Sequence, residues 1–493
     1  MTSLWLDRAP RIETDEFEAG QQFDEVIVGA GITGLVAALL FSRAGRRVAV
    51  VEARRVGAVT TGNTTAKLSV LQGAHLQQVQ AYSYRAIVKA YVEANLEGLA
   101  WMSRYADDQG IPIQFKDSVS YAATPEGVRT VNREYDIAKA VGLPVRRGTD
   151  VGLPFETHAA VVLPDQAQFD PMDVLATLAA DVRSHGGKIF EDVRVSRAKA
   201  GDPAKVFTNK GQLLAQHVIV ATGIPVLDRG LYFAKVKAGR SYAMSYRVDG
   251  ALPPGMYMSV DSSLKRSVRT TPSADGDLLI IGGNGHTVGR DPSPKSHVRD
   301  LEEWTQQHWP GAVRTHAWSA QDYETPHKVP FVGWMPRGRG RIYLATGYDK
   351  WGMTNSVQCA LTLASDILGG NTPWAKVLHR RITTPRAFAW GVGYNAGVAV
   401  EYAKGYAKAL LRGLPDSPPD EGEGVVGRDG LLPTGMSTVN GVVCRVSAVC
   451  THQHAVLSWN DQEHSWDCPA HGSRFGADGT LLEGPATRNL RLR

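Results

Sequence analysis

The segment VIVGAGITG at residues 26–34 decides how this chain folds. It stands where a strand-like run at 24–28 gives way to helical spacing at 35–43, and a second apolar run follows at 47–51. When the spacing of apolar residues changes from a period of 2 residues to one of 3.6 residues and back, the pattern is typical of a strand, a helix and a second strand. The segment therefore predicts a βαβ unit with its glycines at the turn between strand and helix.

The three glycines of this segment and the acid that follows them have separate predicted tasks. Gly29 permits the tight turn, Gly31 lets a pyrophosphate approach the backbone, and Gly34 lets the helix pack closely on the strand. Glu52 ends the second strand, 18 residues after Gly34, where its carboxylate can accept hydrogen bonds from an adenosine ribose. The combination predicts a site for an adenine dinucleotide.

Length and composition restrict the class of protein. A chain of 493 residues exceeds what one hydrophobic core usually serves, so we expect two or three domains. The net charge is only +5 and the basic residues are scattered among acids, which disfavours nucleic acid as a partner. No apolar run reaches the roughly 20 residues that a membrane span needs, and the start of the chain lacks a signal core. Four cysteines are too few for a disulfide framework, so we expect a cytoplasmic protein.

The order of predicted elements divides the chain into domains. Alternating strands and helices favour an α/β domain of the Rossmann type. Strand-like runs between Pro/Gly turns predict a mostly antiparallel sheet in an α+β substrate domain, and a stretch of Pro, Gly and acids predicts a linker. The predicted boundaries are 1–231 and 336–412 for the α/β domain, 232–335 with parts of 80–165 for the substrate domain, 413–424 for the linker and 425–493 for the last domain.

Two pairs of metal-binding residue types lie near the end of the chain. Cys450 and His452 form a C-x-H pair, and Cys468 and His471 form a C-x-x-H pair after 15 intervening residues. Two thiolates and two imidazoles suit tetrahedral zinc, and they also suit a [2Fe–2S] centre with the cysteines on one iron and the histidines on the other. These four residues are the predicted metal ligands.

The residues around these pairs resemble Rieske domains over about 424–493. The matching stretches are SAVCTH at 447–452, WDCPAHGSRF at 466–475 and GPA at 484–486. The resemblance implies an all-β domain that holds a Rieske-type [2Fe–2S] cluster rather than zinc. It also implies that the imidazole edge at His452 and His471 is exposed and passes electrons onward.

Two departures from the respiratory Rieske pattern affect the predicted cluster. Ala455 and Ala470 stand where that pattern has a disulfide between the two ligand loops, so we expect packing alone to hold the loops. Ser473 is retained, but Phe475 replaces a tyrosine whose hydroxyl would lie near the sulfur atoms. Fewer donors to sulfur imply a potential in the lower or middle part of the roughly −150 to +300 mV range of such centres.

Segments beyond the glycine motif resemble the D-amino-acid oxidase and glycine oxidase superfamily of FAD enzymes over roughly 20–370. The matching stretches are TTGNTTAK at 60–67, ATG at 221–223 and 345–347, and GYDKWGMT at 347–354. The resemblance implies FAD, with the start of the last long helix stabilising negative charge on the reduced flavin. Segments 64–67 and 318–323, where some relatives attach the flavin, contain neither His nor Cys, so we expect non-covalent FAD.

The resemblance assigns FAD contacts to the glycine motif, to the acid that follows it and to the matching stretches. The predicted residues are Gly29, Gly31, Ile32, Thr33, Gly34, Glu52, Ala53, Arg54, Thr61, Thr65, Ala66, Lys67, Val195, Ala221, Thr222, Gly223, Gly347, Gly352, Met353 and Thr354.

The two halves together resemble a bacterial group of FAD-dependent oxidoreductases that carry a Rieske domain or are similar to γ-glutamylputrescine oxidase. In that group the flavin module oxidises a C–N bond by taking hydride from the carbon next to an amine. The implied partners are a small amine or amino-acid-like substrate and an external electron acceptor, which is a carrier protein, a quinone or a partner enzyme. The implied catalytic residues are Lys67, Tyr323 and Lys350, and the implied substrate-binding residues are Arg240, Arg269 and His286.

Other functions fit the sequence less well. A flavin/Rieske reductase that feeds another redox enzyme is the alternative. Electron flow from a nicotinamide would need a second dinucleotide fold, and the glycines at 282–285 lead into prolines that cannot open a helix. A Rieske oxygenase would need two histidines and a carboxylate on a further iron, and no closely spaced histidine pair lies outside the cluster loops.

Overall fold

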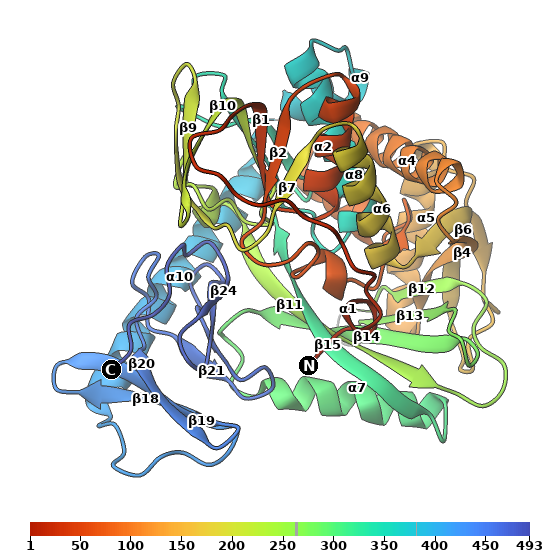
Figure 1. Ribbon diagram of the computed structural model, residues 1–493. Helices are drawn as coiled ribbons and strands as arrows, with labels where there is room; N and C mark the ends of the chain where they lie inside the picture. Colours follow the sequence, from red (N-terminus) through yellow and green to blue (C-terminus); the bar gives the residue numbers. More distant parts are fainter. Residues whose placement is uncertain (262–264, 381) are drawn as a thin grey trace.

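The computed structural model describes residues 1–261, 265–380 and 382–493. Figure 1 shows two large sheets with helices packed on them, and a small β domain that the long helix α10 (Pro385–Leu411) joins to the rest. No helix among the described residues has the length and apolar character needed to cross a bilayer. The short elements are α1 (Leu4–Asp7), η1 (Thr61–Asn63), η2 (Pro125–Gly127) and η3 (Tyr232–Ala234).

The first sheet carries the predicted βαβ unit. Its strands run in the order β16-β17-β10-β1-β2-β7, with β8 and β9 attached beside β10. Ile27 of β1 packs toward the helices, while Val26 and Val28 pack on the opposite face. Both faces of the central strands are therefore buried, which explains the nearly continuous apolar runs in the sequence. The strands are β1 (Gln22–Val28), β2 (Val48–Val51), β7 (Lys188–Phe190), β8 (Val195–Lys199), β9 (Ala204–Thr208), β10 (Gly211–Val220), β16 (Phe331–Trp334) and β17 (Ile342–Thr346).

Three helices cover one face of this sheet. Helix α2 (Ile32–Arg43) starts immediately after β1 and packs against α6 (Pro171–Ser184) and α8 (Gly352–Leu368). The side chain of Asp170 caps α6 by accepting a hydrogen bond from the Met172 amide, and Pro171 occupies the first helical position, where its missing N–H costs nothing. The carboxyl ends of β1 and β10 and the start of α2 consequently meet at one edge of the sheet.

The second sheet draws its strands from two separate parts of the chain. Its strands run in the order β15-β11-β14-β13-β12-β4-β6-β3, with β5 beside β6, and the β12–β4 pair is parallel. Strands from the 67–169 segment thus continue the sheet made by the 237–324 segment. The strands are β3 (Lys67–Leu68), β4 (Ile113–Ala122), β5 (Arg146–Gly148), β6 (Ala159–Phe169), β11 (Lys237–Arg247), β12 (Met256–Ser259), β13 (Arg266–Thr271), β14 (Leu278–Thr287) and β15 (Val313–Glu324). The helices near it are α3 (His75–Tyr82), α4 (Arg85–Asp108), α5 (Val128–Ala140) and α7 (Pro294–His308).

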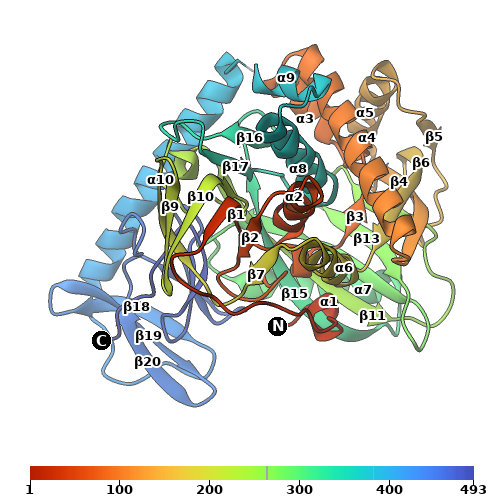
Figure 2. The same cartoon turned by 45° about the horizontal axis from the view of Figure 1, so that its top comes forward.

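The C-terminal domain consists of two small sheets. Figure 2 shows α10 running along the part of the molecule that contains the first sheet, here called the first lobe, and ending beside the C-terminal domain. Tyr394 and Val398 of α10 share a hydrophobic cluster with Val446 and Trp466. The strands are β18 (Gly424–Asp429), β19 (Leu432–Val439) and β20 (Val442–Ser447) in one sheet, and β21 (Ser458–Asn460), β22 (Ser465–Asp467), β23 (Arg474–Gly476) and β24 (Leu481–Glu483) in the other. Helix α9 (Pro373–His379) lies before α10.

Candidate functional site

A deep cavity opens where β1 ends and α2 begins. Gly29 has a φ of 109°, and a Cβ there would lie 2.6 Å from the carbonyl oxygen of Ala221, so this turn requires glycine. Gly31 is the N-cap residue that precedes α2 and provides no side-chain cap, which leaves backbone amide groups of the first turn available to an anion. The cavity therefore offers a phosphate a close approach to the backbone.

The other end of this cavity holds the predicted ribose acceptor. Glu52 accepts hydrogen bonds from the amide nitrogens of Ala30 at 3.0 Å and Arg54 at 2.8 Å. Burial raises the pKa of Glu52, although these two hydrogen bonds act in the opposite direction. A partly buried carboxylate and a glycine turn at a helix N-terminus, both lining one cavity, are what a bound FAD requires.

Most of the predicted FAD residues line this cavity, and some do not. The lining residues of the predicted set are Gly29, Gly31, Ile32, Thr33, Glu52, Ala53, Arg54, Thr61, Val195, Ala221, Thr222, Gly223, Gly347, Gly352 and Met353. Gly34, Thr65, Ala66, Lys67 and Thr354 lie outside it. Thr65 and Lys67 instead line a second cavity, which shares Thr60, Thr64, Asp322, Lys350 and Met353 with the first.

Lysines dominate the charged groups of the second cavity. Lys67, Lys265 and Lys350 line it together with the single acid Asp322. Burial, followed by the nearby charge of Arg269, lowers the pKa of Lys67 to about 7. Its Nζ donates to the carbonyl oxygen of Tyr257 at 2.6 Å and to Ser267 Oγ at 2.5 Å. A lysine in this state can exchange a proton with a bound substrate near neutral pH.

Lys350 reaches both cavities because of an unusual turn. Gly347, Asp349 and Lys350 have φ values of 82°, 46° and 71°, so two residues with side chains adopt the left-handed conformation just before α8. Such a conformation costs free energy and persists only where the surroundings hold it. Tyr323, also predicted as catalytic, lines the first cavity, and burial raises the pKa of its hydroxyl well above the usual value.

The three residues predicted to bind substrate line neither cavity. Arg269 donates to the carbonyl oxygens of Thr65 and Ala66, each at 2.8 Å, and so holds the segment before Lys67. Arg240 points instead toward the C-terminal domain. We therefore propose that Arg269 positions the segment before Lys67, and we propose no substrate contact for Arg240 or His286.

His286 belongs to a cluster that the sequence analysis overlooked. His286, Asp291 and His297 place potential ligand atoms within 4.8 Å of one another, because the start of α7 brings His297 against β14. The two imidazole rings are stacked at 4.9 Å with planes only 6° apart, so their lone pairs do not converge on one point. His297 Nε2 lies 2.9 Å from Asp291 Oδ2 and His286 Nε2 lies 3.2 Å from the Tyr242 hydroxyl. Hydrogen bonds therefore explain why these three side chains lie together, and no metal ion is needed to hold them.

The four predicted metal ligands lie on two loops that meet, one between β20 and β21 and the other between β22 and β23. Cys450 and Cys468 are buried, and their side chains hydrogen-bond to each other. The rings of His452 and His471 are 5.3 Å apart, and the Nδ1 atom of each is buried without a hydrogen-bond partner. A buried imidazole nitrogen left in this way fits a metal ligand. Two adjacent sulfur atoms and two such nitrogens fit the donor set of a Rieske [2Fe–2S] cluster.

The surroundings of this site differ from expectation in two ways. The imidazole edge is not exposed: the His452 side chain is 5% exposed, and the ring of Phe233 stands edge-on to both histidines at 4.8 and 4.9 Å. The fold buries it because η3 of the first lobe lies against the ligand loops. The loops are also held by more than packing: three tyrosines of α10 donate to loop carbonyl oxygens, namely Tyr394 to Ala470, Tyr402 to Gln453 and Tyr406 to His454.

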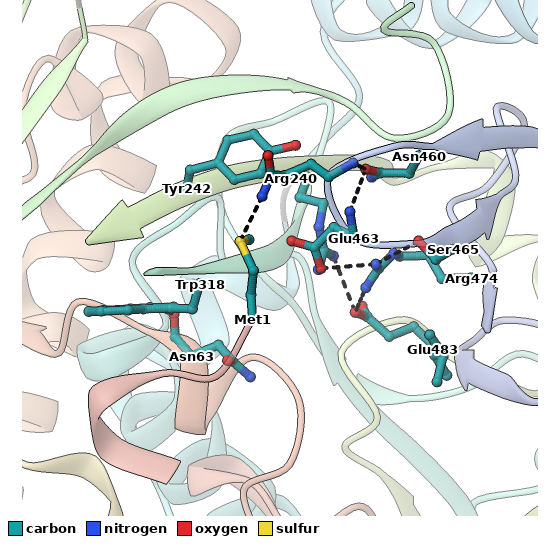
Figure 3. A network of polar contacts seen from close by, with 12 residues as sticks. Met1, Asn63, Arg240, Tyr242, Trp318, Asn460, Glu463, Ser465, Arg474 and Glu483 are labelled. Carbon is teal, nitrogen blue, oxygen red and sulfur yellow. Dashed lines mark hydrogen bonds and ion pairs between the residues drawn. The ribbon is translucent and has the colours of Figure 1, made fainter. Parts of the chain in front are cut away.

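A buried network of ion pairs joins the C-terminal domain to the second sheet (Figure 3). Arg240 of β11 pairs with Glu463 at 2.8 Å and Glu483 at 3.3 Å, and Arg474 pairs with the same two acids. Burial alone would raise the pKa of Glu463, but Arg240 and Arg474 lower it to about 2. The pairing of each charge compensates its desolvation, so the interface tolerates these groups.

Residues of the C-terminal domain also reach the first cavity. Leu482, Glu483, Gly484 and Ala486 line it. Gln321 of β15 donates from Nε2 to the carbonyl oxygen of Gly472 at 2.8 Å and to the Tyr323 hydroxyl at 2.9 Å, which links a cavity wall to the loop that carries His471. No periodic pattern in the sequence could indicate these contacts.

Comparisons with known proteins agree with the resemblances seen in the sequence. A family model described as FAD dependent oxidoreductase matches residues 24–365, and a model described as Rieske [2Fe-2S] domain matches residues 424–492. YhfW of Bacillus subtilis (strain 168), which is named as a Rieske 2Fe-2S iron-sulfur protein, is 29% identical over 99% of this chain and 96% of its own length. Glycine oxidase from Geobacillus kaustophilus superposes with a TM-score of 0.60 at 20% identity over 72% of this chain and 96% of that chain. L-Amino acid deaminase from Proteus myxofaciens does so with a TM-score of 0.59 at 16% identity over 74% and 94%.

Proposed function

Because this chain belongs to the FAD dependent oxidoreductase family and ends in a Rieske [2Fe-2S] domain, we propose that it oxidises the C–N bond of an amine or amino-acid-like substrate and delivers the electrons one at a time to an external acceptor. FAD supplies an acceptor for hydride, and the cluster supplies a one-electron site. The names of the glycine oxidase and the L-amino acid deaminase that share the fold support a substrate of this chemical class.

The observation that carries the proposal is the shared wall between the two sites. Gly484 and Ala486 of the Rieske domain line the FAD cavity, and Gln321 bridges Tyr323 and Gly472. Groups held this close exchange electrons without a separate docking step. The ligands that we propose are Cys450 and Cys468 for one iron and His452 and His471 for the other.

The second cavity is the proposed substrate site. It adjoins the FAD cavity, with which it shares the lining residues Asp322 and Lys350, so a substrate there would lie beside the flavin. Neutral Lys67 would accept the proton that a substrate ammonium must lose before its C–H bond can be oxidised. Lys265 and Lys350 would attract a carboxylate on an amino-acid-like substrate.

An anaerobic screen of amines and amino acids tests the proposal. A substrate should bleach the flavin absorbance and produce the low-temperature EPR signal of a reduced Rieske cluster in the same sample. The variant Cys468→Ala, loaded with FAD, should still bleach but give no cluster signal. Bleaching of the wild-type flavin with a cluster that stays oxidised would refute the proposed electron route, and absence of bleaching across the screen would refute amine oxidation.

A further inference from the structure

A groove open to solvent lies beside the cluster site, between the first lobe and the Rieske domain. It is lined by Thr451 and His452 of the first ligand loop, by 485–488 of the Rieske domain, and by residues of β8 and of the segment 226–229. Val226 and Ala486 line both this groove and the FAD cavity, which places the groove on the far side of one thin wall. His452 is therefore the proposed cluster ligand that lies next to the groove: its side chain is only 5% exposed, and its Nε2 meets the exposed Asp228 at the groove wall.

The side chains around this groove are strongly cationic. Asp228 is the one acid among its lining residues, and Asp228 Oδ1 lies 3.0 Å from His452 Nε2. Arg229 is held by the carbonyl oxygens of Ala198 and Arg337, which fix its position without neutralising its charge. The cationic lining residues are Arg197, Lys199, Arg229, Arg337 and Arg488, and all of them except Arg229 are exposed.

Other approaches to the proposed cluster ligands are covered. Tyrosines of α10 lie on both ligand loops, and Phe233 stands against the two imidazole rings. The second ligand loop packs on the large sheet, where Gln321 meets Gly472. Electron transfer to an outside acceptor weakens steeply with distance, so the acceptor has to enter through the groove.

We infer that this groove is the docking surface for an acidic one-electron carrier protein. Opposite surface charge speeds encounter and orients the carrier with its redox centre toward His452. A small-molecule site would instead be lined mainly by apolar side chains with few charges, whereas five cationic side chains and one acid line this groove. Each docked carrier takes one electron and no bond forms or breaks, so two carriers leave reduced for each substrate molecule oxidised. The inference rests on the proposed function.

The experiment uses holoenzyme reduced chemically with dithionite and freed of excess reagent, so its outcome does not depend on any amine substrate. Oxidation of the cluster is followed by stopped flow with two carriers of opposite charge, acidic plant plastocyanin and basic cytochrome c. Binding is measured separately with redox-inactive zinc-substituted plastocyanin by calorimetry. At low ionic strength plastocyanin should oxidise the cluster faster than cytochrome c does, and the ratio of the two rates should fall steeply with added salt.

Charge reversal at the groove provides the decisive comparison. The double variant Arg337→Glu and Arg488→Glu should slow oxidation by plastocyanin and weaken its binding by about tenfold or more at low salt, and should speed oxidation by cytochrome c. The double variant Arg129→Glu and Lys139→Glu on α5, beside the second sheet, changes the net charge by the same amount away from the groove. It should leave the rates with both carriers unchanged. Iron content, FAD content and the EPR spectrum show whether each variant is intact.

Three outcomes would overturn the inference. They are equal effects of the two double variants, a plastocyanin rate that does not depend on salt, and intact groove variants that bind zinc-substituted plastocyanin as well as the wild type does. A fast salt-dependent reaction with plastocyanin in a protein that no amine reduces would leave the docking surface standing and refute the proposed substrate class instead.

Discussion

Gly31 and Gly34 lie three residues apart, yet an added methyl group would meet different neighbours at each. A Cβ at Gly31 would lie 3.0 Å from Thr61 Oγ1 alone, at the end of a side chain that can move. A Cβ at Gly34 would collide with the carbonyl oxygen of Gly29, which is backbone and cannot move without opening the turn. The first glycine therefore serves the ligand, and the second serves the contact of α2 with β1.

This difference predicts separate effects for two alanine variants. Gly31→Ala should raise the dissociation constant for FAD by about tenfold or more and leave the stability of the apoprotein nearly unchanged. Gly34→Ala should lower the free energy of unfolding by about 1–3 kcal/mol, the usual cost of overpacking. Fluorescence titration of apoprotein with FAD and urea unfolding measure the two quantities. Equal losses of FAD affinity and stability in both variants would contradict this division.

The buried amine of Lys67 predicts a pH dependence of catalysis. Its folded pKa of about 7 lies below the ordinary value of 10.5, so Lys67 is increasingly neutral above pH 7. Hence kcat/KM for flavin reduction should rise through about pH 7, and Lys67→Met should remove this limb and lower the rate about a hundredfold. Lys139→Met, on the surface of α5, is the control. A Lys67→Met variant that keeps the same limb would show that another group titrates.

Lys67 also affects stability, and the sign follows from the same shift. At pH values between about 7 and 10.5 the unfolded chain keeps a proton on Lys67 that the folded protein has lost. The free energy of unfolding therefore rises with pH across this window, and below pH 7 the cost of burying the charge is present in full.

At the scale of elements, α10 and the ligand loops form one unit. Tyr394, Tyr402 and Tyr406 are spaced by eight and four residues, which places them along one side of the helix. Their hydroxyl groups hold loop carbonyl oxygens 48 to 76 residues further along the chain. The helix thus contributes part of the restraint that a disulfide gives in respiratory Rieske proteins.

We expect the double variant Tyr402→Phe and Tyr406→Phe to loosen the first ligand loop. Each lost hydrogen bond costs about 1 kcal/mol, so the loss of both makes transient opening of the loop up to about thirtyfold more frequent. Iron release to a chelator, followed by absorbance, should accelerate accordingly. Tyr84→Phe at an exposed position is the matched control. An unchanged release rate would mean that packing alone holds the loop, as the sequence suggested.

At the scale of the whole molecule, the Rieske domain is attached by buried ion pairs. Glu463 has a pKa of about 2, and the pKa of Glu483 is also lowered because Arg240 and Arg474 outweigh the effect of burial. Since both folded pKa values lie below the ordinary 4.5, the pairs stabilise the folded chain above pH 4.5. This contribution is lost as the pH falls toward 2.

Low pH and the variant Arg240→Met should therefore weaken the same interface. At pH 7 Arg240→Met should cost about 3–5 kcal/mol, because two acids remain buried with Arg474 alone. The difference from the wild type should shrink below pH 4.5, where the acids take up protons. Thermal unfolding from pH 3 to 8 measures both effects, with Arg47→Met at a surface ion pair as the control. A pH-independent difference between Arg240→Met and wild type would contradict the role of these acids.

The family, the fold class and the two cofactors could be predicted without the structure, because they depend on residues close together in the chain. The turn glycines and Glu52 act through local backbone geometry, so their spacing indicates an adenine dinucleotide. The spacing of the C-x-H and C-x-x-H pairs indicates a metal site, and the resemblance of the surrounding residues to Rieske domains indicates which one. Their individual roles as ligands remain proposals, as do the predicted domain boundaries.

The contacts between domains and between distant segments became known from the three-dimensional structure alone. Arg240 pairs with acids of the Rieske domain, Phe233 covers imidazoles that were expected to be exposed, and β4 joins the second sheet by parallel pairing with β12. Each of these contacts joins segments far apart in sequence. Such contacts form when whole surfaces dock on each other. The residues of a docked surface follow no regular spacing in the sequence, so the sequence does not show which surface they will meet.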